Sequence, residues 1–368
     1  KQHHKKRPYR NWHSRESFAL NGIFDSLDKD ANQPELVAKL FVEPLRPVEQ
    51  AYFIAEDPRQ SKWSTFRDNG RSKVTEELAD MVLQAERSVT IQTPYLVLTS
   101  PAVKMFKKLR KQNRKIDMRI STNSLAATDS WYVYALSYKQ KKTYLDDLGF
   151  RIYEFKPLPE DMPLFMPKYE QLKIRAELAY QKKREEAEAE LSESTDESSI
   201  DNSHSALLVK EEKPFFCMHA KSLVIDDAVA FVGSYNLDPR SENINTECGL
   251  VIKDRNFSIA LSRYIKVDMQ PQNSWVIAKK KRLDGVDEVN KVLVELSSMI
   301  PLVDLWPFRY SASFELKKGK LAVETDHPDF YKNYRDVGNF PRVRNRDVSK
   351  EVGARGTKMF LGFIKPLL

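Results

Sequence analysis

One stretch of the sequence, residues 218–236, carries the side chains best suited to chemistry on a phosphate. It reads MHAKSLVIDDAVAFVGSYN. His219 can act as a nucleophile or as a proton shuttle, because imidazole titrates near neutral pH. Lys221 supplies a fixed cation, while Ser234, Asn236 and the backbone N–H groups beside them can hold phosphate oxygens. This combination favours phosphoryl transfer.

The stretch also indicates which further groups the chemistry needs. A metal ion or other cofactor is not expected, since Lys221 beside His219 would repel a metal and no carboxylate cluster accompanies the pair. An imidazole that acts on a phosphate is usually held in one tautomer by a carboxylate on its other nitrogen. Glu247, which precedes a predicted strand, is the candidate for this role.

The spacing within the motif predicts which side chains share a face. Residues two apart in a strand point the same way, so His219 and Lys221 form one pair and Ser234 and Asn236 another. Asp226 completes the motif, and we count it with the catalytic residues. It lies an odd number of positions from both members of the first pair, at an expected hairpin turn between SLVID and VAFVG. We therefore expect Asp226 to face away from the phosphate that they bind.

The elements before the motif alternate between strands and helices. This alternation predicts an α/β fold, with a mixed, mostly parallel sheet flanked by helices. Ligands of such sheets bind beyond the carboxyl ends of strands. Tyr95 and the loop that contains Asn123, Ser124 and Asp129 follow two predicted strands, and we take the first three as candidate substrate-binding residues. The elements are helices over 73–87, 101–112 and 130–147 and strands from 88 to near 94, over 116–122 and over 150–155.

Composition divides the chain into four predicted regions. Prolines and a basic run mark residues 1–70 as a connector or the remnant of a preceding half. Residues 71–156 and 214–310 form the catalytic half. Between them, residues 157–213 read as an insertion, a helix followed by a mobile acidic loop. The basic tail, residues 311–368, packs over the core or contacts a membrane through its apolar end.

The overall composition limits the classes of protein and partner. Hydrophobic residues make up 41% and charged residues 30%, which is ordinary for a globular protein. A net charge of +8 favours an anionic partner such as nucleic acid, an acidic membrane surface or a phosphorylated substrate. Two cysteines are too few for a disulfide scaffold. No run reaches the roughly 18 apolar residues that span a bilayer.

The spacing His-x-Lys-x4-Asp-x6-Gly-Ser-x-Asn, from His219 to Asn236, resembles the signature of the phospholipase D superfamily. Residues 234–250, SYNLDPRSENINTECGL, resemble bacterial cardiolipin synthases and their relatives in particular. The segments QTPYLVL, TNSLAATD and LWPFRYSASFELKKGK are similar to the second catalytic half of that branch. The resemblance covers roughly residues 71–325 and is interrupted by the insertion.

This resemblance implies a fold in which two halves each contribute one motif. One histidine forms a phosphohistidine, the other protonates the leaving group, and water or an alcohol resolves the intermediate. For the cardiolipin branch the implied reaction is phosphatidyl transfer between phospholipids, or hydrolysis where water is the acceptor. The implied partners are a phospholipid substrate and an anionic membrane surface, in the bacterial cell envelope at the inner membrane or its periplasmic face. Nucleic acid is not the expected partner.

The sequence departs from this pattern because it holds one complete motif. His3 and His4 are each followed two positions later by lysine, but Arg10 and Asn11 stand where the aspartate belongs. The remaining histidines outside the motif lack the lysine: His13, His204 and His327. The partner motif could come from an upstream half, which the absence of an initial methionine favours, or from a second copy in a symmetric dimer. Alternatively the chain has lost catalysis and binds membranes, or it cleaves nucleic acid with the same motif.

Overall fold

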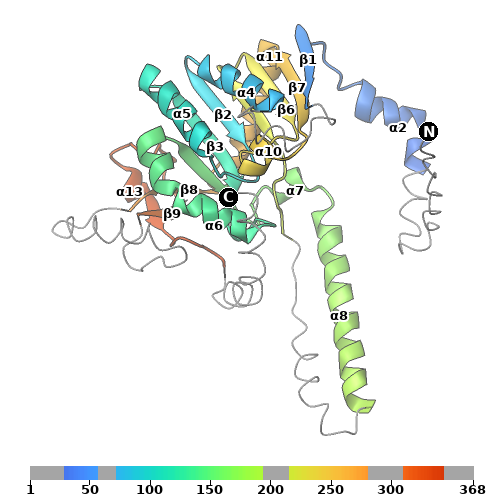
Figure 1. The fold of residues 1–368 in the computed structure, drawn as a ribbon. Coiled ribbons are helices and arrows are strands. Elements are labelled where there is room, and N and C mark those ends of the chain that lie inside the picture. Colours follow the sequence, from blue (N-terminus) through green and yellow to red (C-terminus); the bar gives the residue numbers. More distant parts are fainter. Residues whose placement is uncertain (1–28, 57–71, 194–214, 281–309, 344–368) are drawn as a thin grey trace, which may run out of the picture. The chain divides into compact units, whose positions relative to one another are not determined.

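The computed structural model of the 368-residue chain describes residues 29–56, 72–193, 215–280 and 310–343 (Figure 1). The chain divides into two compact units, residues 1–49 and 50–368. In the first unit, the described residues form a helix, α2 (Pro34–Val37), and a π-helix, η2 (Ala38–Val42), neither with a buried side chain. Several predictions lie outside the described residues: the basic arm, the acidic loop, a helical run near residues 289–308 and the apolar end of the tail.

In the second unit, the described strands form one ten-stranded sheet in the order β1-β7-β6-β5-β2-β3-β4-β8-β9-β10. The predicted strands before and within the motif are all present. The strands are β1 (Gln50–Ala55), β2 (Ser88–Gln92), β3 (Asp117–Asn123), β4 (Arg151–Phe155), β5 (Ser222–Ile225), β6 (Val229–Gly233), β7 (Cys248–Lys253), β8 (Ser274–Lys279), β9 (Ser311–Leu316) and β10 (Tyr334–Asp336).

The predicted α/β class with a mixed sheet is confirmed, but the expectation of mostly parallel pairing is wrong. Only β2 pairs in parallel with β3 and β3 with β4, while the other seven pairings are antiparallel. One reason is the hairpin from β5 to β6, because a short turn can connect only antiparallel partners. Asp226 and Asp227 make this turn with φ values of 55° and 52°. Longer segments join the later strands, with α10 between β6 and β7 and α11 between β7 and β8.

Helices cover both faces of the sheet. On one face α4 and α5 lie side by side and pack Val74, Leu78, Phe106 and Leu109 into the larger core cluster (Figure 1). On the other face α11 contributes Ile265 to a second cluster. The helices of this unit are α4 (Lys73–Leu83), α5 (Ser100–Gln112), α6 (Trp131–Lys139), the π-helix η3 (Thr143–Leu148), α7 (Met162–Phe165), α8 (Tyr169–Glu193), α10 (Pro239–Asn243), α11 (Arg255–Asp268) and α13 (Phe330–Asn333).

The sheet extends beyond the bounds predicted for the catalytic half. β1, predicted as part of a connector, pairs with β7, and β9, predicted as part of the tail, pairs with β8. The prolines that suggested a connector end at Pro47, so every residue of β1 keeps an N–H group for pairing. In the insertion, α8 agrees with the predicted helix and its described side chains are mostly exposed. Among the described helices, none has the length and apolar character to cross a membrane.

A buried carboxylate on α11 gives the fold a predicted dependence on pH. Asp268 is 2% exposed, and its side chain accepts hydrogen bonds from Gln92 Nε2 (2.5 Å) and Ser121 Oγ (3.4 Å). Burial raises the pKa of Asp268 to about 6, although these two bonds oppose the shift. The native state thus holds the proton more tightly than the unfolded chain. This contribution to stability is complete below about pH 4 and is lost as pH rises through about 6.

We therefore expect Asp268→Asn to stabilise the protein at pH 8 by up to about 3 kcal/mol, because a pKa raised from 3.8 to about 6 corresponds to that free energy. At pH 4.5 the difference from wild type should fall to about a third of that value. Urea unfolding at the two pH values measures both free energies. Asp80→Asn, at an exposed position of α4, is the matched control. Destabilisation by Asp268→Asn at pH 8 would show that the hydrogen bonds of the ionised carboxylate stabilise the fold by more than its burial destabilises it.

Candidate active site

The predicted motif lines an open cavity of about 640 Å³ at the ends of β5 and β6. Side chains from three chain segments meet there, one before β5, one after β6 and one before β7. The lining residues are His219, Lys221, Gly233, Ser234, Asn236, Asn245, Thr246 and Glu247. The structure brings the candidate residues His219, Lys221, Ser234, Asn236 and Glu247 together, and it adds Asn245 and Thr246.

Two glycines let the strands beneath the cavity approach closely. Gly233 of β6 pairs with Gly249 of β7, and the Phe231 ring lies against both. A Cβ atom on Gly249 would stand 2.3 Å from Phe231 Cε2, and one on Gly233 would stand 2.4 Å from the Cys248 carbonyl oxygen. Only glycine fits at either position. This close pairing brings Ser234, which follows β6, next to Glu247, which precedes β7.

His219 and Lys221 contact each other directly. Lys221 Nζ lies 2.8 Å from His219 Nδ1 and 3.3 Å from Nε2, and it donates to the His219 carbonyl oxygen at 2.7 Å. The imidazole is exposed in the cavity, whereas Lys221 is buried. Burial lowers the pKa of Lys221, and the carboxylate of Glu247 is the strongest opposing influence. The pair therefore presents a ring nitrogen and a cation to the same space.

Glu247 lines the cavity, but it does not hold the imidazole as the sequence analysis expected. Its carboxylate is 3% exposed and accepts hydrogen bonds from Ser234 Oγ, from Ser241 Oγ (2.7 Å) and from Asn245 Nδ2 (3.0 Å). None of the hydrogen bonds that Glu247 makes within the described residues goes to His219. The carboxylate instead holds the loop from Ser234 to Asn245 together.

Asp226 lies at the opposite end of β5 from Lys221, outside the cavity. Its Oδ1 accepts from the backbone N–H groups of Arg87 and Ser88, both at 2.7 Å, and its Oδ2 accepts from that of Glu86 at 2.8 Å. Asp226, counted with the catalytic residues and expected to face away from the phosphate, thus lies apart from His219 and Lys221. Asp226 joins the hairpin turn to the start of β2.

The three candidate substrate-binding residues lie close to the motif but have different surroundings. Asn123 pairs with the backbone of Met218, donating to its carbonyl oxygen at 2.8 Å and accepting from its N–H at 3.1 Å, so it orients the chain before His219. Ser124 is 1% exposed, and its hydroxyl has no hydrogen-bond partner among the described residues. Tyr95 alone reaches the site, with its ring edge-on to His219 at a centroid distance of 6.4 Å.

Asn236 carries an unsatisfied polar atom at the cavity. Its backbone N–H donates to Ser241 Oγ at 3.1 Å, which fixes the loop before α10. Its side-chain oxygen is buried and has no hydrogen-bond partner in the described part of the chain. Buried polar atoms are nearly always paired in native proteins, so an unpaired one at a cavity indicates a place for a ligand or water. With regard to metal ions, the described ranges contain no group of three His, Cys, Asp or Glu side chains arranged to bind one.

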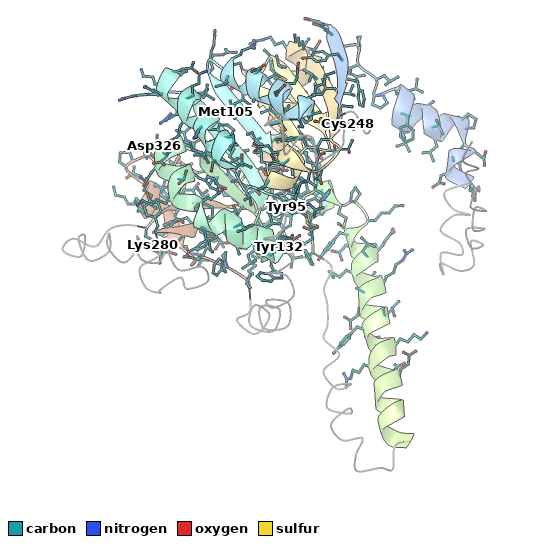
Figure 2. All side chains as sticks on the ribbon, in the orientation of Figure 1. Tyr95, Met105, Tyr132, Cys248, Lys280 and Asp326 are labelled. Atoms are coloured by element: carbon teal, nitrogen blue, oxygen red, sulfur yellow. The ribbon has the colours of Figure 1, made fainter. Side chains whose placement is uncertain are left out.

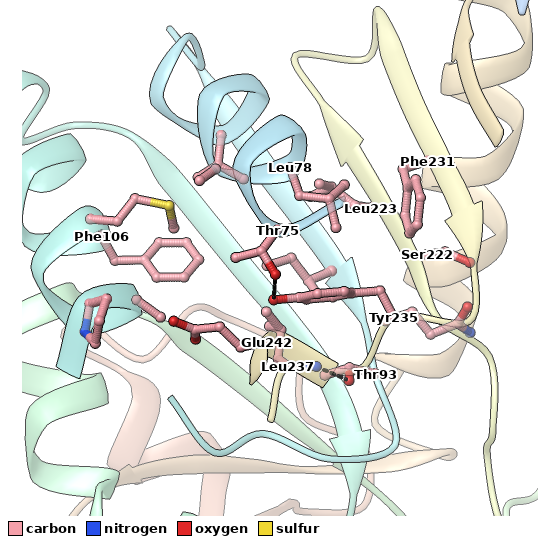
Figure 3. A pocket seen from close by; sticks show the side chains of 17 residues that line it. Thr75, Leu78, Thr93, Phe106, Ser222, Leu223, Phe231, Tyr235, Leu237 and Glu242 are labelled. Carbon is pink, nitrogen blue, oxygen red and sulfur yellow. Dashed lines mark hydrogen bonds between the residues drawn. The ribbon is translucent and has the colours of Figure 1, made fainter. Parts of the chain in front are cut away.

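The residue between Ser234 and Asn236 was missed by the sequence analysis. The Tyr235 ring points away from the cavity into a separate apolar pocket of about 70 Å³ beneath α4 and α5 (Figure 3). Its hydroxyl lies 3.1 Å from Thr75 Oγ1 in the first turn of α4 (Figure 3). The period of two could have predicted this, because a side chain between two that face one way faces the other.

We expect Tyr235→Phe to lower the turnover of a phosphodiester substrate about fivefold, because one hydrogen bond of about 1 kcal/mol ties the loop to α4. The change should appear in kcat, with KM nearly unchanged, since Tyr235 does not line the cavity. Tyr153→Phe is the control, because it removes the hydroxyl that donates to Glu324 (3.2 Å) far from the loop. Equal losses of turnover in both variants would contradict a specific role for Tyr235.

Comparison with known proteins gives consistent matches. Residues 78–269, over half of the chain, match the family described as cardiolipin synthase, PLD-like domain. The chain is similar to cardiolipin synthase C of Escherichia coli K12, with 26% identity over 266 residues, which cover 68% of this chain and 46% of the relative. Among solved structures it is similar to NucT from Helicobacter pylori (13% identity, TM-score 0.35, 61% of this chain and 98% of that one). A phospholipase D family member, Nuc from Salmonella typhimurium, is comparable (12% identity, TM-score 0.34, 61% and 97%).

The lengths of these relatives differ from that of the chain. It spans 46% of cardiolipin synthase C and 40% of each of two uncharacterised Helicobacter pylori proteins that it also matches. The chain thus spans less than half the length of these curated relatives.

Proposed function

Because the chain belongs to the family of cardiolipin synthase, PLD-like domains, we propose that it catalyses phosphatidyl transfer between phospholipids, with hydrolysis when water is the acceptor. The observation that carries the proposal is the cavity in which His219, Lys221, Ser234 and Asn236 meet. A cation, a nucleophilic nitrogen and neutral hydrogen-bonding groups around one open space suit a phosphodiester anion.

In the proposed reaction, a ring nitrogen of His219 attacks the phosphorus atom of the donor lipid. The bond from phosphorus to the head-group oxygen breaks as the phosphorus–nitrogen bond forms, giving a phosphohistidine. Lys221 binds a non-bridging oxygen. Burial lowers the pKa of Lys221, and the negative charge of the bound phosphate would oppose that shift. The hydroxyl of a second lipid then attacks phosphorus, which releases the imidazole, and its proton passes to the group that protonated the departing head-group oxygen in the first step.

The departing head-group oxygen needs a proton that this motif does not supply while its own imidazole is the nucleophile. We propose that a second histidine, from an upstream half of the same protein or from a second copy of the chain, protonates it. Support comes from the single complete motif in this sequence and from the match to cardiolipin synthase C, which covers 46% of that relative. With a second copy, the specific activity rises with protein concentration, whereas with an upstream half it does not.

We further propose that the protein works at an anionic membrane surface of the bacterial cell envelope, at the inner membrane or its periplasmic face. Its net charge of +8 favours contact with anionic lipids. Its similarity to cardiolipin synthase C of Escherichia coli also supports a place at a bacterial membrane.

Incubation with phosphatidylglycerol vesicles and, separately, with single-stranded DNA tests the proposed function. Transfer between two phosphatidylglycerol molecules yields cardiolipin and one glycerol, so both products should appear in equal amounts. Phosphatidic acid would indicate hydrolysis by the same intermediate. Cleavage of DNA without any lipid product would overturn the proposal in favour of a nuclease. Vesicle binding without turnover at any protein concentration, both by this chain and by a longer chain that carries any upstream half, would favour a membrane-binding module.

A further inference from the structure

The helix of the insertion, α8, lies outside both core clusters. It is 25 residues long, which corresponds to about 38 Å of helix. Neither cluster of the described residues includes any of its side chains, and those drawn in Figure 2 leave the helix on both sides. Leu172, Ile174 and Leu178 are exposed. Helices in water gain most of their stability from packing, so α8 needs a partner that the two clusters do not supply.

The charged residues of α8 follow the order that stabilises a single helix least. Residues 182–190 read KKREEAEAE, so a basic block, 182–184, precedes an acidic block, 185–193, that contains five glutamates. The C-terminal end of a helix is the negative end of its dipole, and it repels glutamates. A glutamate four residues before a lysine also stabilises a helix better than the reverse order does. Both effects count against this sequence in an isolated helix.

An ion pair between the two blocks offsets little of this cost. Lys182 Nζ and Glu186 Oε1 are 3.8 Å apart, and their side chains are 78% and 60% exposed. The pair has the less favourable order, with the lysine first. Exposed pairs contribute little, because water solvates both charges and salt screens them. A neighbouring helix with the opposite order of charges removes the conflict.

A second copy of α8 that runs antiparallel has that order. Its acidic block lies beside the basic block of the first helix, and the two dipoles oppose each other. A two-fold axis between residues 184 and 185 sets Arg184 opposite Glu185 and sets position 183, a lysine, opposite position 186, a glutamate. The same axis sets the exposed Leu178 opposite position 191, which is also a leucine. Charge and apolar character thus agree on one register.

We propose that α8 of one copy of the chain binds α8 of a second copy as an antiparallel pair, with the boundary between the two blocks at the two-fold axis. The helices overlap from residue 176 to residue 193, over about 27 Å. This inference goes beyond the proposed function, because α8 contributes no residue to the candidate active-site cavity. The insertion serves assembly and not the reaction.

Exchanging the charges of one block at a time tests the pair in the full chain. Sedimentation equilibrium measures the dimer dissociation constant of each variant alone and of the two variants mixed. A control makes the first charge change on the exposed face of α5. The variants are Lys182→Glu/Lys183→Glu/Arg184→Glu, Glu185→Lys/Glu186→Lys/Glu188→Lys and, as the control, Lys104→Glu/Lys108→Glu/Lys111→Glu.

Either exchange in α8 should raise the dissociation constant at least about a hundredfold, because the two-fold axis repeats every exchanged contact. An equal mixture of the two variants should dimerise again, since one then carries only acidic and the other mainly basic residues in this part of α8. The control should dimerise like the wild type. Raising the salt concentration from about 0.05 M to about 0.5 M should weaken the wild-type dimer.

Each other outcome overturns the proposal. These outcomes are a wild-type chain that stays monomeric at every concentration, a dimer that neither exchange weakens, and a mixture that stays monomeric. An equal loss in the α5 control does so too, because it assigns the effect to net charge. Lipid turnover is measured in the same preparations. Lipid product from a monomeric chain overturns this inference alone. A dimer held by α8 that yields no lipid product, with or without an upstream half, overturns the proposed function alone.

Discussion

Replacing His219 with alanine should lower the proposed phospholipid turnover by at least about a thousandfold, because the variant has no nitrogen with which to form the proposed phosphohistidine. The fold should be unaffected. The imidazole is exposed, and its contacts are with Lys221 and the edge of Tyr95, not with either core cluster. Initial rates on phosphatidylglycerol vesicles and the urea midpoint of unfolding measure the two effects.

His327→Ala is the matched control for this experiment. His327 is exposed, and its Nδ1 accepts a hydrogen bond from the Asp329 backbone N–H at 3.1 Å, in a turn before α13. Its loss should leave turnover within about twofold of wild type, as is usual for surface substitutions. Turnover by His219→Ala at the wild-type rate would remove His219 from the mechanism. A fall in stability that accounts for the lost turnover would assign it a structural role.

Replacing Lys141 with methionine should destabilise the protein by about 3–5 kcal/mol, because it leaves a buried carboxylate without its cation. Lys141 Nζ and Glu154 Oε1 are 2.7 Å apart, with side chains 5% and 2% exposed. Tyr134 donates to the same carboxylate, and burial raises the pKa of its hydroxyl well above the usual value. Neither Lys141 nor Glu154 lines the cavity. The substitution should therefore lower the free energy of unfolding more than it lowers the turnover of the folded protein.

A second ion pair of equal length provides the control. Lys107 Nζ and Asp147 Oδ2 are also 2.7 Å apart, but their side chains are 49% and 44% exposed. Water solvates both charges when the pair is broken, so Lys107→Met should change stability by about 0–1 kcal/mol. Urea unfolding of both variants measures how burial changes the free energy lost when an ion pair of the same N···O distance is broken. Similar losses in the two would show that the lost lysine packing, and not the orphaned charge, sets the effect at Lys141.

Sequence reasoning located most of the strands and the motif because these depend on local order. A period of two placed His219 with Lys221, and the expected hairpin turn between SLVID and VAFVG is present between β5 and β6. The same reasoning could not identify partners that are distant in sequence. Asn123 pairs with Met218, 95 residues later, and Asp226 with the chain near Arg87, 139 residues earlier. No local pattern encodes which strands become neighbours, so neither of these partners could be predicted.

Glu247 illustrates a different limit. Its place beside the site followed from the strand that it precedes, but its three donors, Ser234, Ser241 and Asn245, depend on how the loop before β7 closes. Such loops have no period from which their geometry can be read. Asp129 was noticed for its position after a strand. Its hydrogen bond with Tyr95, which comes from a different segment of the chain, could not be predicted in the same way.

The aspartate of the motif sets the register of a strand. The four residues between Lys221 and Asp226, Ser222–Ile225, are β5 in its entirety. Asp226 fastens the far end of β5 to the start of β2, with which β5 pairs from Val89↔Ile225 to Gln92↔Ser222. In a sheet, a slip of one residue turns every side chain to the opposite face. The spacing His-x-Lys-x4-Asp therefore measures the length of one strand, and by holding its far end it determines on which side of the sheet the lysine emerges.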